Sequence, residues 1–151
     1  KIIHGDLRAA NILIDSRRNA RLTDFGISTM TRNDTKVCHA ETVTNVRWLA
    51  YELVGIPRWE ARDRVNEQTD MFAFGCVMHE VLTKLPPFHD EDEEDVMTAK
   101  KRRGLPPYPD RVHGDVWQAM VKFWNIDPST RPTAERAHVM MDELVRSLPD
   151  S

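Results

Sequence analysis

Two short polar segments, separated by an aliphatic run, constrain this chain more than any other part of its sequence. The first segment spans residues 4–11 and reads HGDLRAAN, and the second spans residues 24–26 and reads DFG. Residues 12–14 and 20–23 between them are largely β-branched and aliphatic, and the polar residues 15–19 separate these two runs. This alternation predicts short strands joined by a turn.

The residue types in these segments suit phosphoryl transfer, which needs metal ions to neutralise phosphates and a group that orients the attacking hydroxyl. Asp6 and Asn11 match the catalytic-loop template of protein kinases, and Asp24 begins the second motif of that template. Asn11 and Asp24 offer hard oxygen ligands of the kind that Mg²⁺ prefers. Taken singly, each residue could be a capping or turn residue, but their joint spacing favours the catalytic interpretation.

The chain resembles the C-terminal lobe of eukaryotic protein kinases, closest to the tyrosine-kinase and tyrosine-kinase-like branch. Three later segments extend the resemblance: residues 47–52 (RWLAYE), residues 70–75 (DMFAFG) and residues 127–133 (DPSTRPT). The resemblance implies a mainly α fold with short β-strands near the N-terminus (α+β). The smaller, ATP-gripping lobe is expected to be absent, since no glycine-rich loop or strand lysine precedes the catalytic loop in this chain.

The domain implied by the resemblance is a partial protein kinase domain over residues 1–151. Its expected parts are a catalytic loop at 4–11, a metal-binding motif at 24–26, an activation segment at 24–52 and a helical subdomain at 68–148. ATP and Mg²⁺ are the expected cofactor and metal, and a protein is the expected substrate. The oligomeric state stays open.

Local patterns predict the helices independently. Residues 71–82 are apolar nearly all round and predict a buried central helix, formed from roughly 68 to 83, with Asp70 just ahead of the apolar run. An acidic run at residues 90–95 leads into a helix that ends on the basic residues 100–103, an order that suits the helix dipole. The remaining predictions are a short helix at 48–54, a long loop at 28–46, and helices near 115–124 and 133–147.

The resemblance also implies roles for individual residues. Asp6 is expected to be the catalytic base, with Asn11 and Asp24 as the Mg²⁺ ligands. Leu13 is expected to form part of the floor under adenine and to bind ATP together with Asp24. Arg8 is either a contact to substrate or phosphate or a solvated surface residue, and we carry it as a catalytic candidate.

Two structural pairings follow from the same resemblance, together with one structural histidine. Glu52 should pair with Arg131, and Asp70 should accept hydrogen bonds from the backbone of the catalytic loop. His4 is expected to pack structurally and is not a catalytic candidate.

Two departures from the family pattern bear on function. Gly5 stands where many kinases carry an arginine that docks a phosphate on the activation segment, so that route to activation is expected to be missing. Tyr51 replaces the usual proline of the Ala-Pro-Glu motif, a change expected to affect the substrate-side loop.

Substrate class and activity leave alternatives open. The sequence RAA after the base is typical of tyrosine kinases, whereas residues 44–46 favour a tyrosine-kinase-like serine/threonine enzyme, which is the reading we adopt. The fragment alone is expected to be inactive. The alternatives are a pseudokinase or interaction scaffold, or a truncated product that competes for a kinase's partners.

Composition excludes several other classes of protein. A length of 151 residues supports one domain, and a net charge of −3 provides no basic field for nucleic-acid binding. Cys38 and Cys76 are too few for a disulfide scaffold, so both are expected to be free thiols in a cytoplasmic protein. No apolar run approaches the length of a membrane span.

Overall fold

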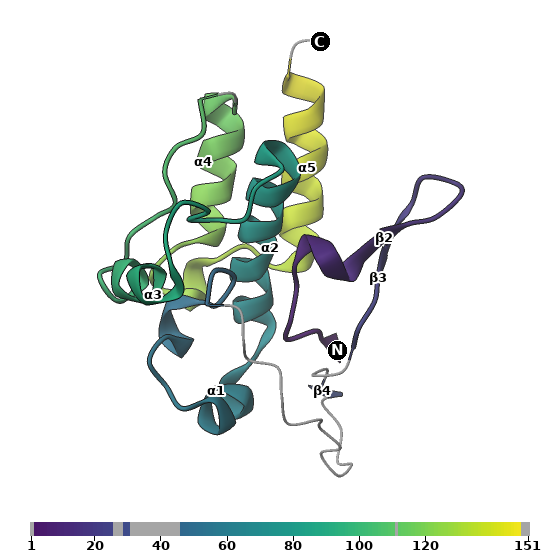
Figure 1. Cartoon of the computed structure of the whole chain (residues 1–151). Coiled ribbons are helices and arrows are strands. Elements are labelled where there is room, and N and C mark those ends of the chain that lie inside the picture. Colours follow the sequence, from purple (N-terminus) through teal and green to yellow (C-terminus); the bar gives the residue numbers. More distant parts are fainter. Residues whose placement is uncertain (1, 26–28, 31–45, 111, 149–151) are drawn as a thin grey trace.

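The computed structural model describes residues 2–25, 29–30, 46–110 and 112–148 (Figure 1). Helices dominate this part of the chain, which confirms the prediction of a mainly α fold with short strands. The elements, in chain order, are β1 (Ile2–Ile3), η1 (Ala9–Asn11), β2 (Ile12–Ile14), β3 (Ala20–Leu22), β4 (Thr29–Met30), η2 (Tyr51–Leu53), α1 (Arg58–Arg64), α2 (Glu67–Thr83), α3 (Glu93–Lys101), α4 (Gly114–Phe123), η3 (Pro128–Thr130) and α5 (Ala134–Ser147).

The central helix α2 begins at a capping box. The Asn66 side chain accepts hydrogen bonds from the backbone N–H groups of Gln68 and Thr69, while the Thr69 hydroxyl accepts from the Asn66 N–H. The helix ends at Lys84, which adopts the left-handed conformation with φ 62°. This confirms the predicted central helix. Asp70 lies in the first turn of this helix, ahead of the apolar run, as predicted.

Helix α4 packs against α2, α5 packs against α4, and all three helices contribute side chains to one core (Figure 1). Gly75 lets α2 and α4 approach closely, since a Cβ at this position would lie 2.8 Å from Trp124 Nε1 and 2.9 Å from Phe123 Cβ. Buried side chains from several elements fill this core, including Phe72, Cys76, Val116, Met120, Phe123, Trp124 and Ala137. The predicted helices near 115–124 and 133–147 are confirmed.

Two small antiparallel pairs of strands precede the helices. Strand β2 pairs with β3, with Leu13 opposite Arg21, and the Asp15–Asn19 turn between them bends at Arg18, whose φ is 65°. The other pair joins β1 to β4, with Ile3 opposite Thr29. The prediction of an unbroken loop from residue 28 to 46 is therefore wrong at β4. A two-residue strand paired across more than twenty positions leaves no local periodicity.

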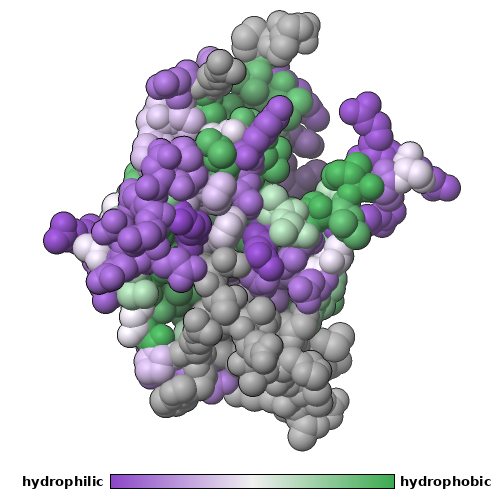
Figure 2. Space-filling model, viewed as in Figure 1, coloured by the Kyte–Doolittle hydropathy of each residue, from purple (hydrophilic) through white to green (hydrophobic). Residues whose placement is uncertain are grey.

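The β2–β3 hairpin projects from the helices and exposes apolar side chains (Figures 1 and 2). Leu13 is 60% exposed, and Ile14 and Leu22 are also largely open to solvent. Figure 2 shows hydrophobic surface over the strands and hydrophilic surface at the turn. The hairpin thus presents an apolar face that this chain does not cover within its described residues.

Two further predictions need correction. Helix α1 was not expected, and the helix predicted at 48–54 is a single 3₁₀ turn, η2. Cys76 is a buried free thiol, whereas Cys38 lies outside the described residues. In the described part of the chain, no helix is long and apolar enough to cross a membrane.

Candidate active site

Asp70 of α2 fixes the start of the predicted catalytic loop. Its carboxylate accepts hydrogen bonds from the backbone N–H of His4 at 2.7 Å and of Gly5 at 2.9 Å. Burial raises the pKa of Asp70, and these two backbone donors oppose that shift. The expected contact between Asp70 and the loop backbone is confirmed, and it ties the loop to the central helix.

The Asp6 carboxylate lies within a compact network of loop side chains. Asn11 Nδ2 donates to the Asp6 carbonyl oxygen at 2.8 Å and to Asp6 Oδ2 at 3.0 Å. Arg8 Nε lies 3.3 Å from the same Oδ2, at ion-pair distance, although the contact does not meet hydrogen-bond geometry. The three catalytic candidates are therefore brought together, with Asn11 and Arg8 both directed at one oxygen of Asp6.

Thr23 connects the catalytic loop to the segment that carries Asp24. Its N–H donates to the Asn11 carbonyl at 2.9 Å, and its carbonyl lies 2.9 Å from His4 Nε2. The His4 ring also packs against Phe25, with 4.9 Å between ring centroids. This supports the structural role expected for His4.

Asp24 adopts a left-handed backbone conformation, with φ 58°, and its side chain is exposed. Non-glycine residues take this conformation rarely and at an energetic cost, and such residues cluster at functional sites. This conformation comes immediately after Thr23, whose backbone N–H and carbonyl oxygen are both held by contacts with the preceding loop. The backbone therefore turns sharply where the predicted metal ligand stands.

The donor set of this site fits Mg²⁺ bound together with phosphates. Because the Asn11 amide nitrogen donates to Asp6, its carbonyl oxygen is left as a ligand atom, and Asp24 adds a carboxylate. Within the described residues, no cluster of three or more His, Cys, Asp or Glu side chains could hold a metal ion. Two protein oxygens suit Mg²⁺, which usually keeps water and phosphate ligands.

Glu80 joins the catalytic loop to the end of the predicted activation segment. Its Oε2 accepts from the Ala9 N–H at 2.9 Å and from Trp48 Nε1 at 2.7 Å. Our reading of the sequence missed this residue. The available signal was one carboxylate within the otherwise apolar run of α2, which needs a partner when it is partly buried.

The same segment is anchored by a buried ion pair. Arg131 donates to the two carboxylate oxygens of Glu52 at 2.7 and 2.8 Å, and its side chain is inaccessible to solvent. It also donates to the carbonyls of Gln68 and Asn125, both at 3.0 Å. The expected Glu52–Arg131 pair is therefore confirmed as a bidentate contact.

A second anchor comes from Lys100 on α3. Its Nζ donates to the carbonyls of Arg47 at 2.8 Å and Leu49 at 2.6 Å, and the residue is only 1% exposed. Burial lowers the pKa of Lys100 to about 8. The sequence pattern predicts only that Lys100 is one of the basic residues that suit the C-terminal end of the helix dipole. That prediction is incomplete, because the side chain of Lys100 points inward and holds the end of the predicted activation segment.

Tyr51 and Arg47 add further links from this segment to neighbouring turns. The Tyr51 hydroxyl donates to the Gly104 carbonyl at 3.0 Å, and its buried ring contacts Phe72 edge-on. The Arg47 guanidinium donates to the carbonyls of Phe88 and Glu91. Tyr51 in place of proline thus gains a hydrogen bond that a proline lacks.

Comparison with known proteins gives a consistent family. The family described as "Protein tyrosine and serine/threonine kinase" matches residues 1–141. The chain is 33% identical to Kinase suppressor of Ras A of Caenorhabditis elegans over 143 residues, which is 88% of this chain and 18% of that protein. It is 29% identical to Serine/threonine-protein kinase STY17 of Arabidopsis thaliana over 150 residues, covering 99% of this chain and 25% of that protein.

A third relative, Dual specificity protein kinase shkD of Dictyostelium discoideum, is 27% identical over 148 residues, covering 96% of this chain and 19% of that protein. The chain thus spans between 18% and 25% of the length of these relatives. The match to the family extends over most of the chain, from the strands into the first half of α5. The chain therefore belongs to the protein tyrosine and serine/threonine kinase family.

Proposed function

We propose that this chain is the C-terminal, substrate-binding lobe of a protein kinase domain that transfers the γ-phosphate of ATP to protein hydroxyl groups. One observation carries the proposal: Asp6, Arg8 and Asn11 form a contact network, and Thr23 links that network to the residue before Asp24. Phosphoryl transfer depends chiefly on positioning and charge stabilisation, and this network supplies both.

Each residue has a distinct role in the proposed reaction. Asp6 orients the substrate hydroxyl and accepts its proton, while the Arg8 guanidinium beside it balances negative charge. Asn11 and Asp24 would hold Mg²⁺, which neutralises charge on the transferred phosphate when bound. The Asn11 amide nitrogen also holds Asp6 in place. Asn11 therefore has two proposed roles, because it positions the base and is itself one of the metal ligands.

The exposed β2–β3 hairpin supports a nucleotide site at this edge of the molecule. Leu13 offers apolar surface that could lie under adenine, and the hairpin begins directly after Asn11. The kinase template places a glycine-rich loop and a phosphate-binding lysine before the catalytic loop. We therefore propose that efficient turnover requires a smaller lobe joined to this chain, and that the chain alone is inactive.

For the substrate class we propose serine and threonine hydroxyls. The support is the sequence of residues 44–46, which lacks the proline that tyrosine kinases usually place before the Arg-Trp pair. Arg8 followed by two alanines points the other way. Matched peptides that differ only in serine, threonine or tyrosine would decide the question by their kcat/KM ratios. We place the activity in the cytoplasm, where the buried Cys76 thiol stays reduced.

A scaffold without catalysis is the second candidate, and it has an observation of its own. Gly5 cannot dock a phosphate, and Tyr51 and Lys100 fasten the end of the activation segment to α3 and to the turn after it. A segment held in this way could present a fixed surface to other proteins. The intact Asp6, Asn11 and Asp24 favour the kinase.

Phosphate transfer from labelled ATP to a general protein substrate, with Mg²⁺, tests the proposal. The assay would compare this chain with the same chain extended upstream through any encoded small lobe, and with the extended Asp6→Asn variant. Transfer by the extended protein alone, lost on Asp6→Asn, is the expected result. Absence of transfer in every form, with nucleotide binding also absent, would favour the scaffold.

A further inference from the structure

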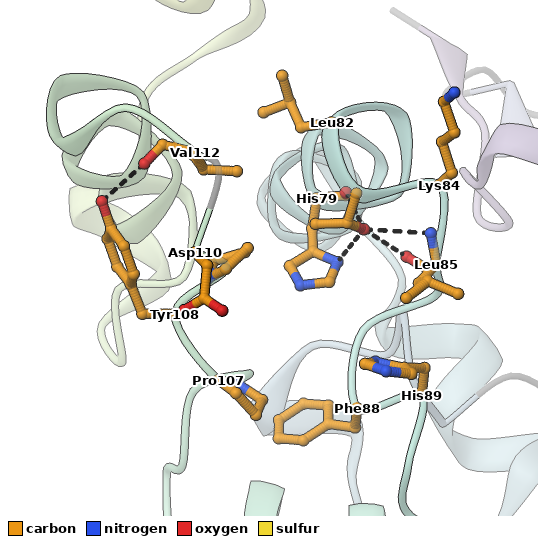
Figure 3. Close-up of a pocket in the computed structure, with 12 residues that line it drawn as sticks. His79, Leu82, Lys84, Leu85, Phe88, His89, Pro107, Tyr108, Asp110 and Val112 are labelled. Atoms are coloured by element: carbon orange, nitrogen blue, oxygen red, sulfur yellow. Dashed lines mark hydrogen bonds between the residues drawn. The ribbon is translucent and has the colours of Figure 1, made fainter.

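A pocket lies at the C-terminal end of α2, away from the residues assigned to phosphoryl transfer. Its volume is about 480 Å³, within the range of sites that hold small molecules. Its walls are the last turn of α2, the turn that follows it, and residues 107–110 with Val112 (Figure 3). The apolar wall residues are Leu82, Leu85, Phe88, Pro107, Tyr108, Pro109 and Val112.

The fold holds these walls in place before any ligand arrives. The Tyr108 hydroxyl donates to the Val112 carbonyl at 2.7 Å, and the Tyr108 ring packs edge-on against Trp117. On the opposite wall, Lys84 and Phe88 both adopt left-handed backbone conformations, with φ of 62° and 56°, which define the turn between them. A pocket formed by such constrained segments is largely pre-formed, so the free-energy cost of ordering its walls on ligand binding is small.

His79 is the buried polar group of this pocket. The residue is only 4% exposed, and its ring projects from α2 into the space between Asp110 and Phe88 (Figure 3). Nδ1 lies 3.4 Å from the Thr83 hydroxyl oxygen. Among the residues that the structure describes, no hydrogen bond reaches Nε2. A ring nitrogen that faces a cavity without a protein partner, on a residue that is itself buried, is a hydrogen-bonding position that a ligand can fill.

The Thr83 hydroxyl determines which nitrogen of His79 carries the proton. Its oxygen lies 2.7 Å from the His79 carbonyl and 3.0 Å from the Leu85 carbonyl, so its single proton is directed at a carbonyl. The contact with Nδ1 is then favourable only if Nδ1 donates. Burial lowers the pKa of His79, so the ring is neutral, and this network assigns the lone pair to Nε2.

We propose that this pocket binds a small aromatic ring that carries one N–H or O–H donor, with the donor bonded to His79 Nε2 and the ring held among Leu82, Leu85 and Tyr108. Indole and phenol groups have this chemistry. The apolar walls favour the ring, and the neutral acceptor favours the donor over an anionic group. The proposal does not depend on phosphoryl transfer by this chain.

The turn that forms one wall of the pocket also contacts the activation segment. Phe88 lines the pocket, while its backbone carbonyl accepts from the Arg47 guanidinium on the other side of the turn. Pro87, one residue earlier, also accepts from Arg47, at 3.1 Å. An occupant that moves this turn would therefore act on Arg47. Arg47 precedes Trp48 in the sequence, and Trp48 donates to Glu80. Binding at the pocket and the geometry of the activation segment are linked through one short stretch of backbone.

Titration of the ¹⁵N-labelled chain with indole, followed by NMR, tests the proposal directly. Benzofuran is the matched probe, since it keeps the two-ring shape and has oxygen in place of the N–H. Indole should shift the amide signals of Thr83 and Leu85 and bind about fivefold tighter than benzofuran, the value of one neutral hydrogen bond. N-acetyl-tryptophanamide, with the same ring on a peptide backbone, distinguishes a protein side chain from a free small molecule as the source.

Two variants make the test specific to His79 and to the pocket. His79→Leu keeps an apolar wall and should make indole and benzofuran bind equally, whereas His138→Leu, an exposed histidine on α5, should change nothing. Leu85→Trp, at a half-exposed wall position, should fill the pocket and abolish binding of both probes. Equal binding of the two probes to the unmodified chain, no shift at millimolar indole, or unchanged indole binding in Leu85→Trp would each overturn the proposal.

Discussion

Lys100 joins α3 to the end of the predicted activation segment through one buried charge, and burying that charge has a desolvation cost. Its ammonium group donates to the carbonyls of Arg47 and Leu49 and lies over the Phe72 ring, 4.7 Å from the centroid. Burial nevertheless lowers its pKa to about 8, because these partners do not fully replace water around the charge. A neutral amine keeps two N–H donors, which is enough for the two carbonyls.

The contribution of Lys100 to stability should therefore rise in mildly alkaline solution. Above pH 8 the folded protein releases the Lys100 proton, whereas the unfolded chain keeps it until about pH 10.5. At this residue the unfolded state binds more protons in that window, so its contribution to the free energy of unfolding rises with pH. Relative to Lys100→Met, the unmodified protein should gain about 3 kcal/mol across the window, measured by urea unfolding at a series of pH values.

The neighbouring Lys101 is exposed and supplies the control for this experiment. Lys101→Met removes the same side chain from an exposed position and is the matched substitution against which the Lys100→Met curve is compared. Parallel stability curves for the unmodified protein and Lys100→Met would mean that Lys100 titrates normally.

The Glu52–Arg131 pair should be the most sensitive single contact at the end of the activation segment. Glu52→Ala leaves the fully buried Arg131 guanidinium without its carboxylate, which should lower the free energy of unfolding by about 3 kcal/mol. Thermal unfolding followed by circular dichroism measures the loss. Glu52→Gln, which keeps an acceptor oxygen, should lose less, and an unchanged melting midpoint in Glu52→Ala would contradict the importance of the pair.

Helices α2 and α4 meet at Gly75, and this contact sets how closely two elements of the core can approach. Alanine is a better helix former than glycine by about 1 kcal/mol, so propensity alone predicts that Gly75→Ala stabilises α2. The Cβ would however meet Trp124 and Phe123 at distances below 3 Å. We expect a net destabilisation of about 2 kcal/mol, since the backbone or a large ring must move.

Gly114, at the start of α4, is the matched control for this prediction. A Cβ there meets no atom within 4 Å, so Gly114→Ala should be neutral or slightly stabilising. Denaturant midpoints of the two variants give the comparison. Equal midpoints for both substitutions would show that α2 and α4 separate easily.

Local pattern predicted some elements well and others poorly, for physical reasons. The central helix and the helices near 115–124 and 133–147 carry capping residues and apolar faces, so their sequences indicate them directly. Helix α1 is short and charged, and β4 depends on a partner strand far away in the sequence. The spacing of Asp6, Asn11 and Asp24 predicted the candidate site, but the roles of Glu80 and Lys100 depend on tertiary contacts.

In the described chain, the residue proposed to bind the metal and the residues that support the predicted catalytic loop lie in different surroundings. Asp24 projects from an exposed turn, whereas the residues that hold the catalytic loop belong to the buried face of α2. In a protein extended to include a smaller lobe, Asp24→Asn should reduce Mg²⁺-dependent phosphate transfer on the order of a hundredfold or more, because a neutral amide binds the metal more weakly.

The fold should survive the same change. An exposed Asp24 side chain contributes little to the core, so the melting midpoint of Asp24→Asn should stay close to that of the unmodified protein. Asp127→Asn, at a capping residue far from the site in the sequence, controls for the loss of one carboxylate. Full activity in Asp24→Asn would remove this residue from the proposed metal site.

The single oxygen of Glu80 that accepts from both Ala9 and Trp48 has an evolutionary consequence. Any replacement at this position has to satisfy donors from two segments that are almost forty residues apart, one in the catalytic loop and one in the activation segment. Neither donor can lose its acceptor without leaving a polar N–H poorly solvated. The donor at Ala9 is a backbone N–H, which every residue except proline retains, whereas the donor at Trp48 belongs to its side chain. Trp48 and Glu80 are therefore expected to change together in the lineage that carries this chain, while position 9 is free to vary among residues other than proline.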